Sequence, residues 1–179
     1  MKAEGGLKEK DLRELATCKI GELIIRNAEL SADGKYRWWL RRTFEDGKGV
    51  VCFIMLNPST ADANIDDPTI RQCMGFAHRW GYRTLSVRNL FPYRAANPRK
   101  LLTACDPIGS DRGNNELAAG FTAELVVAAW GTWVPFERDK EAIQLSRGRE
   151  MKCLGVTKNG NPRHPLYVRW DQELIAWPK

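Results

Sequence analysis

The feature that most restricts the fold of this 179-residue chain is a set of apolar runs of strand length, separated by segments long enough for a helix. The clearest runs are 50–56 (VVCFIML) and 125–131 (LVVAAWG). An unbroken apolar run is typical of a strand that is covered on both faces, whereas a strand with one solvated face alternates. Such strands joined by helix-length segments require crossover connections. The sequence therefore predicts a three-layer α/β/α fold with a central, mainly parallel sheet.

An antiparallel hairpin is expected before the central sheet. Residues 22–30 and 36–44 have the composition of strands, and the Asp-Gly step at 33–34 between them favours a tight turn. Residues 1–19 are rich in Lys and Glu and are expected to form an arm or a short helix. Because no repeat or linker interrupts the pattern, residues 1–179 are predicted to form a single domain.

The first crossover helix has a clear start and end. Asp67 is a favoured N-cap residue, Pro68 suits the first helical position, and Gly81 follows the last apolar residue of helical spacing. Further strands are expected at 84–90 and 151–156, and further helices at 113–121 and 137–149.

Cysteine and histidine usage argues against a metal or disulfide scaffold. The five cysteines are scattered without a C-x-x-C pair, and His78 and His164 are the two histidines. Neither a metal nor a cofactor is therefore expected. No apolar run approaches the roughly 18–20 residues that span a bilayer, and the basic N-terminus lacks a signal-peptide apolar region. We expect a monomeric cytoplasmic protein that does not bind a membrane.

The net charge of +6, with a pI near 9.2, fits a polyanionic partner, although an ordinary basic domain would show the same balance. The positions of the cations favour the first interpretation, because many lie near loops that are functional candidates on other grounds. These cations are Arg71, Arg79, Arg83, Arg88, Arg94, Arg99, Lys100 and Arg163.

Four polar loops follow the predicted strands, at 57–67, 89–94, 130–136 and 157–165. In open α/β sheets, ligands bind in the crevice beyond the carboxyl ends of the strands, so these loops are expected to form the site. The chain lacks G-x-G-x-x-G, the P-loop pattern and the G-x-S-x-G elbow, which removes the specific support for dinucleotide, nucleoside-triphosphate and α/β-hydrolase sites. A Ser59–His164 nucleophile pair has no supporting motif.

Four short motifs resemble those of the uracil-DNA glycosylase superfamily, in the same order. They are LNPS at 56–59, VRNL at 87–90, AWG at 129–131 and PRHPL at 162–166. The first is similar to the Asn-Pro turn that holds the attacking water, and the second to the strand end that supplies a base-reading Asn. The third is similar to a strand that ends in Trp-Gly, and the last to the loop that reaches the minor groove and the leaving base.

The stretches 56–67 and 162–167 resemble more closely a small bacterial and phage family, whose suspected members include phage-defence glycosylases that remove glucosylated hydroxymethylcytosine. Ser59 stands where the superfamily has a Gly or an aromatic residue, and the Ser-Pro-Leu-Ser ending of the last motif is absent. These departures argue against ordinary uracil specificity.

The resemblance implies catalytic roles for four residues. Asn57 would hold the nucleophilic water through its side-chain carbonyl, although it would also suit a structural role in the turn. Asp62 and Asp66 would orient or deprotonate that water. His164 would donate to the leaving base or contact a flanking phosphate, although a lone histidine is often structural. Asp67 is expected to serve only as the helix cap.

The remaining candidates would bind the base or the DNA. Asn89 has a donor and an acceptor suited to a Watson–Crick edge, although it would equally satisfy loop backbone groups. The other base-binding candidates are Pro58, Phe91, Tyr93 and Trp130, with Trp133 as a further stacking residue. The DNA-binding candidates are Ser59, Arg71, Arg94, Lys158 and Arg163.

These inferences together predict a monofunctional DNA glycosylase that acts on double-stranded DNA containing modified bases. The predicted substrate is a flipped modified pyrimidine, with glucosylated 5-hydroxymethylcytosine of phage DNA implied by the resemblance, and the product is an abasic site. Lys158 raises the alternative of Schiff-base lyase chemistry, but a single loop lysine is usually a solvated charge. Two other readings remain open: a hydrolase of free modified nucleosides, and a non-catalytic module that binds modified DNA.

Overall fold

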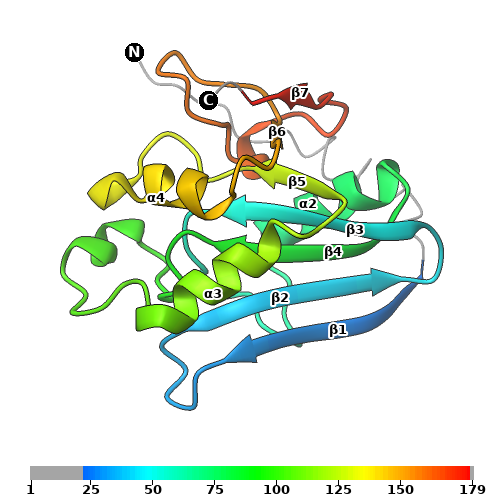
Figure 1. The fold of residues 1–179 in the computed structure, drawn as a ribbon. Helices are drawn as coiled ribbons and strands as arrows, with labels where there is room; N and C mark the ends of the chain where they lie inside the picture. Colours follow the sequence, from blue (N-terminus) through cyan, green and yellow to red (C-terminus); the bar gives the residue numbers. More distant parts are fainter. Residues whose placement is uncertain (1–21, 178–179) are drawn as a thin grey trace, which may run out of the picture.

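The computed structural model describes residues 22–177 as a seven-stranded sheet between helices (Figure 1). The strand order is β1-β2-β4-β3-β5-β6-β7. Strands β4, β3, β5 and β6 run parallel, whereas the β1–β2 hairpin, the β2–β4 pair and β7 are antiparallel. The predicted α/β class and hairpin are confirmed, and the predicted arm at 1–19 lies outside the described residues. The strands are β1 (Leu23–Leu30), β2 (Arg37–Phe44), β3 (Lys48–Met55), β4 (Tyr82–Asn89), β5 (Leu125–Ala128), β6 (Lys152–Cys153) and β7 (Ile175–Ala176).

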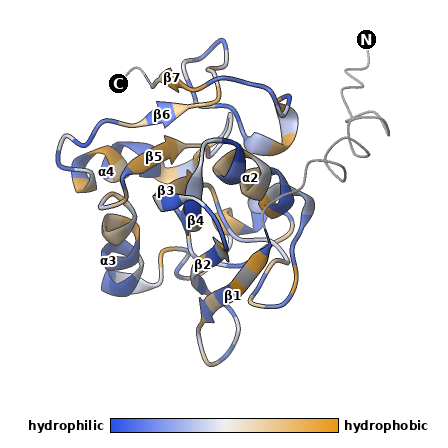
Figure 2. Ribbon diagram, turned by 90° about the vertical axis from the view of Figure 1, so that its right-hand side faces the viewer, coloured by the Kyte–Doolittle hydropathy of each residue, from blue (hydrophilic) through white to orange (hydrophobic). Residues whose placement is uncertain are grey.

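Helices cover both faces of the sheet. Figure 2 views the sheet nearly end-on, with α2 on one side and α3 and α4 on the other. The α-helices are α2 (Pro68–Arg79), α3 (Ser110–Gly120) and α4 (Arg138–Leu145), and the short 3-10 helices are η1 (Pro98–Leu102), η2 (Pro135–Glu137) and η3 (Pro165–Tyr167). No helix among these residues is both long and apolar enough to cross a membrane.

Two predicted elements are shorter than expected. The helix predicted to extend to residue 149 ends at Leu145, because Arg147 and Gly148 take left-handed φ values that break the helix. The strand predicted at 151–156 forms only over Lys152–Cys153, and Gly155, with a φ of 95°, separates it from an isolated bridge between Val156 and Pro162. Residues with left-handed φ values therefore end both elements earlier than predicted.

The position of β3 between two hydrophobic cores explains its unbroken apolar run. Val51, Phe53 and Met55 face the core beneath α2, whereas Cys52 and Ile54 face the core beneath α3 and α4. All five side chains are buried. A polar residue at any of these positions would therefore be buried in one core or the other, which is why the sequence does not alternate.

A β-bulge in the hairpin redirects one side chain. Glu29 pairs with Trp39 but its neighbour Leu30 pairs with Arg37, which leaves Trp38 as an extra residue in β2. Such a bulge reverses the alternation of side chains along the strand. Arg37 consequently points to the α2 side of the sheet, where it contacts the backbone of Ala61.

The topology sets the position of the site. Strand β3 leads into α2 on one face, whereas β5 leads into α4 on the opposite face, and the two strands are neighbours. The loops after their carboxyl ends therefore diverge and leave a crevice between them, as at the switch point of other doubly wound sheets.

Candidate active site

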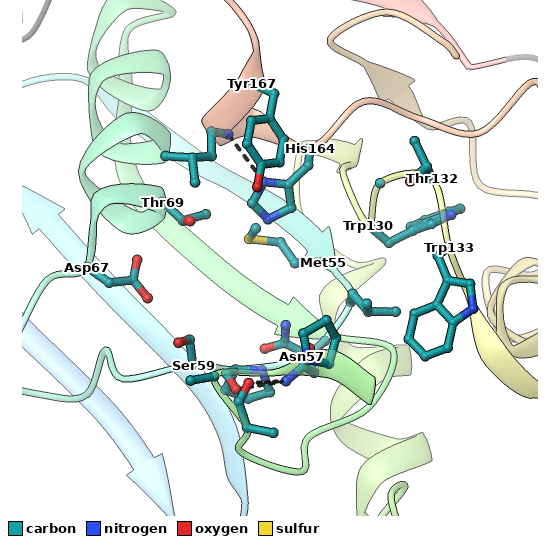
Figure 3. Close-up of a pocket in the computed structure, with 18 of the residues that line it drawn as sticks. Met55, Asn57, Ser59, Asp67, Thr69, Trp130, Thr132, Trp133, His164 and Tyr167 are labelled. Atoms are coloured by element: carbon teal, nitrogen blue, oxygen red, sulfur yellow. Dashed lines mark hydrogen bonds between the residues drawn. The ribbon is translucent and has the colours of Figure 1, made fainter. Parts of the chain in front are cut away.

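A cavity of about 610 Å³ lies at this edge of the sheet. Its walls are formed mainly by residues 55–59, 67–70, 95–98, 130–133 and 157–167. The predicted loops 57–67, 130–136 and 157–165 thus contribute to one cavity. Arg37 and Asn89 complete the lining. Figure 3 shows Asn57 and Ser59 on one side of the cavity, with His164 and Tyr167 opposite them.

Asn57 is held in a single orientation. Its Nδ2 donates to the backbone carbonyls of Ala95 at 2.8 Å and Pro58 at 3.0 Å. Only the amide nitrogen can donate to two carbonyl oxygens, so the flipped arrangement is excluded by chemistry. The amide oxygen has no hydrogen-bond donor among the described residues, and it remains an acceptor for a ligand or a water.

His164 lines the cavity as a neutral imidazole. It caps η3, and its Nδ1 accepts the backbone N–H of Leu166 at 3.3 Å. Burial lowers the pKa of His164 to about 4, against the opposing attraction of Asp67. Because Nδ1 is an acceptor in a neutral ring, Nε2 carries the proton and is a donor. In Figure 3 the ring extends into the cavity.

Asp67 is the carboxylate that faces the cavity. Its Oδ1 accepts the backbone N–H of Ile70 at 2.9 Å, which confirms the predicted N-cap of α2. Asp67 also lines the cavity, beside Thr69 and Ser59 (Figure 3). The second carboxylate oxygen has no described partner, so one side chain both caps the helix and offers an acceptor to a ligand.

Asn89 lies on the cavity wall at the end of β4, next to the redirected Arg37. Arg37 is 2% exposed; its Nη1 donates to the Ala61 carbonyl and its Nη2 to Oδ1 of Asn89, both at 3.0 Å. Desolvation lowers the pKa of Arg37 to about 10, so the guanidinium remains a cation at neutral pH. A buried positive charge therefore lies directly beside Asn89 at the wall of the cavity.

Tryptophans form the wall opposite Asp67. Trp130 is buried and packs edge-on against Trp177 at 4.8 Å between ring centroids. Trp133 carries the Arg99 guanidinium over its ring at 5.2 Å. Tyr167 is 75% exposed at the mouth of the cavity. Planar apolar surfaces of this kind are suited to stacking on an aromatic ligand.

Both predicted catalytic carboxylates, Asp62 and Asp66, lie outside the cavity lining. Asp62 closes its own loop, because its Oδ1 accepts the backbone N–H groups of Asn64 and Ile65, which lower its pKa. Asp66 forms ion pairs with the fully buried Arg42, at 2.8 Å, and with Arg26. Neither carboxylate lines the cavity, and both stabilise the structure around it.

Other predicted residues divide between the lining and the surroundings. Pro58, Ser59 and Arg163 line the cavity with Asn57, Asn89, Trp130 and His164. Five other candidates lie outside the lining. Phe91 is fully buried against Phe136, and Tyr93 packs edge-on against Tyr36. Arg94 donates to the Gly34 carbonyl, Arg71 donates to the Asp66 carbonyl, and Lys158 is exposed.

Several lining residues are not identified from the sequence, among them Arg37, Asp67, Thr69 and Tyr167. The orientation of Arg37 depends on the bulge, which leaves no clear signal in the sequence. Asp67 is predicted only as a helix cap, although a carboxylate at the start of a helix, just after a strand end, is a usable signal for a site residue. Thr69, in the first turn of α2, also lines the cavity. Within residues 22–177 no group of three His, Cys, Asp or Glu side chains is arranged to hold a metal ion.

The model of the family described as "Protein of unknown function (DUF1643)" matches residues 37–166. The chain belongs to this family. The matched segment begins at Arg37 and ends at Leu166, so it contains every residue of the cavity lining except Tyr167. No curated protein and no solved structure matches the chain.

The cavity of this family member contains hydrogen-bond acceptors and donors. Asn57 and Asp67 present oxygens that accept hydrogen bonds, whereas His164 presents an N–H donor and Asn89 has its oxygen occupied by Arg37. The acceptors are suited to a water molecule, and the donors to an atom that becomes negatively charged.

Proposed function

We propose that the chain is a DNA glycosylase that hydrolyses the N-glycosidic bond of a flipped modified pyrimidine and leaves an abasic site. Glucosylated 5-hydroxymethylcytosine in phage DNA is the proposed substrate, on the strength of the motif resemblance. The observation that supports this function best is that one cavity holds two free hydrogen-bond acceptors, on Asn57 and Asp67, together with two donors, on Asn89 and His164.

Asn57 and Asp67 would bind and activate the water. The Asn57 oxygen accepts one water proton as a hydrogen bond, and Asp67 takes the other proton as the water oxygen bonds to C1′ of the deoxyribose. The C1′–N1 bond breaks and its electron pair passes to the base. Because the sugar has oxocarbenium character in this transition state, a carboxylate on its side of the cavity also stabilises positive charge.

Asn89 and His164 would stabilise the departing base. Negative charge that develops on N1 of the pyrimidine is delocalised onto the exocyclic O2 and onto N3, and the His164 Nε2–H and the Asn89 amide are donors available to such atoms. His164 keeps its own proton in this scheme, since its lowered pKa makes it a neutral donor rather than an acid. Arg37 adds a positive charge next to Asn89.

The size and walls of the cavity fit a modified base. A volume of about 610 Å³ is in the ordinary range for small-molecule sites and greatly exceeds that of a bare pyrimidine ring. Trp130 and Trp133 would stack on the extruded base or bound its substituent. A sugar attached to the pyrimidine would occupy the remaining space.

The rim of the cavity offers contacts for the DNA strand. Arg163 is exposed at the mouth, and Arg99 covers the outer ring of Trp133. Both guanidinium groups are available for phosphates flanking the extruded nucleotide. Tyr167 projects from the same edge and would fill the space that the base leaves in the duplex.

Base release from defined duplexes tests the proposal. The purified protein is incubated with duplexes that contain glucosylated 5-hydroxymethylcytosine, 5-hydroxymethylcytosine, uracil or cytosine. Abasic sites are then measured as alkali-labile breaks, and the released base is identified by mass spectrometry. We expect release from the glucosylated duplex. Asn57→Ala should abolish release while retaining DNA affinity, and the exposed Asn115→Ala on α3 serves as a matched control with normal activity.

The other outcomes separate the alternatives. Hydrolysis of free modified nucleosides without action on duplexes would replace the proposal with a nucleoside hydrolase. Retarded mobility of modified duplexes without release would indicate a non-catalytic module. Full activity of the Asn57→Ala variant would remove this residue from the mechanism.

A further inference from the structure

Arg37 is a buried cation that no described carboxylate neutralises by a salt bridge. Its side chain is 2% exposed, and its Nε has no hydrogen-bond partner. Burying a charge is unfavourable unless it is paired, so a cation with two carbonyl-type partners and an unsatisfied nitrogen is not explained by stability alone. The residue is placed there by the bulge at Trp38, and it contacts a residue of the proposed active site.

The contact fixes the orientation of Asn89. A guanidinium has donors and no acceptor, so the atom of Asn89 that lies 3.0 Å from Nη2 of Arg37 must be the amide oxygen. The amide nitrogen consequently points away from Arg37. It donates to none of the described residues, and it is absent from the fully enclosed atoms that lack a partner, so it remains accessible in the cavity lined by Asn89.

We propose that Arg37 is a positioning residue that fixes Asn89 as a hydrogen-bond donor and thereby restricts the cavity to pyrimidines whose N3 is an acceptor. This inference rests on the proposed function, and it defines the chemical class of base that the same site accepts. Cytosine-type bases have acceptors at both O2 and N3, whereas uracil and thymine carry an N3–H.

The Asn89 donor would distinguish cytosine-type from uracil-type bases, because two N–H donors that face each other cannot form a hydrogen bond. The amide N–H of Asn89, whose orientation Arg37 fixes, is a donor that matches the N3 acceptor of a cytosine-type base. An N3–H would meet the Asn89 donor and would lose its own hydrogen bond on leaving water. Loss of a hydrogen bond at a buried polar group corresponds to about tenfold to a hundredfold in binding.

A matched pair of duplexes isolates this effect. One carries glucosylated 5-hydroxymethylcytosine and the other glucosylated 5-hydroxymethyluracil, so the substituent is identical and only the C4 and N3 groups differ. Affinities are measured by fluorescence anisotropy in the Asn57→Ala background, where turnover is prevented, and release rates are measured with Asn57 intact. We expect both readouts to favour the cytosine-type duplex by about tenfold or more.

The sharpest variant is Asn89→Asp, which keeps the shape of the side chain. One carboxylate oxygen would pair with Arg37 and the other would accept from N3–H, so we expect the preference to reverse toward the uracil-type duplex. Arg37→Met should free the amide to rotate and bring the ratio close to one. Arg37→Lys keeps a cationic donor and should restore a preference for the cytosine type. Thermal melting of each variant reports whether it is folded.

The outcomes distinguish this inference from the proposed function. Release of bases with a ratio that Asn89→Asp and Arg37→Met leave unchanged would overturn the role of Arg37 and keep the glycosylase. A binding preference that Asn89→Asp reverses and Arg37→Met abolishes, with no release from any duplex, would support the role of Arg37 and overturn the glycosylase. An equal affinity of the Asn57→Ala protein, with Arg37 and Asn89 intact, for both duplexes would also overturn the inference.

Discussion

Protonation of His164 should destabilise the fold as the pH falls. The pKa of His164 is about 4 in the folded protein, compared with 6.5 ordinarily, because the ring is buried. Between these values the unfolded chain binds a proton that the folded chain does not. Stability from this residue is therefore fully present above pH 6.5 and is lost progressively toward pH 4. The slope is about 1.4 kcal/mol per pH unit, and the total is about 3 kcal/mol.

Denaturant unfolding at a series of pH values measures this dependence. The matched variant is His164→Asn, because asparagine is a good N-cap that can still accept the Leu166 N–H but does not titrate in this range. The unsubstituted protein should lose stability between pH 6.5 and 5 relative to the variant. Carboxylates with lowered pKa values, such as Asp33 at about 2, titrate below this interval. Parallel curves for the two proteins would refute the buried, neutral state of His164.

Three further changes have clear expected results. Arg163→Ala should weaken binding to duplex DNA and reduce the slope of log affinity against log salt by about 1. Binding titrations at several salt concentrations measure this slope, and an unchanged slope would mean that Arg163 contacts no phosphate. Asp66→Ala leaves the fully buried Arg42 without its carboxylate, so the free energy of unfolding should fall by about 3–5 kcal/mol, and a loss below 1 kcal/mol in chemical denaturation would contradict this role. Gly113→Ala would place a Cβ 1.8 Å from the Ile108 carbonyl oxygen, so the melting temperature should drop despite the better helix propensity of alanine; a rise would show that the loop yields freely.

The sequence predicted those parts of the fold that depend on local patterns. The apolar run of β3 identified a strand covered on both faces, and the Asp67-Pro68 step identified the start of α2. The carboxyl ends of parallel strands share one edge, so the loops that form the cavity could be predicted before the structure was known.

The choice among neighbouring carboxylates could not be predicted in the same way. Asp62, Asp66 and Asp67 lie within six residues of one another, and each is chemically able to bind a water. Asp66 is held by Arg42 from a strand far away in sequence, Asp62 by its own loop, and Asp67 is left at the cavity. Long-range pairing decides this, and a single sequence contains no direct signal for it.

The position of Arg37 has a similar cause. Simple alternation in β2 would place it on the face opposite Leu40, and the bulge places it on the same face. Whether a strand bulges depends on its partner strand and on the packing of the extra residue, here Trp38, against Gly109. Phe91, which the sequence predicts as a base contact, does not line the cavity, because its apolar side chain is fully buried in the core.

The most direct test of the central claim is hydrolysis of glucosylated duplex DNA in water enriched in heavy oxygen, with mass spectrometry of both products. The account predicts a free modified pyrimidine without the label and an abasic sugar with the label at C1′, and it predicts neither product for Asn57→Ala. Intact DNA after prolonged incubation with the folded protein, or a label found in the base, would contradict it.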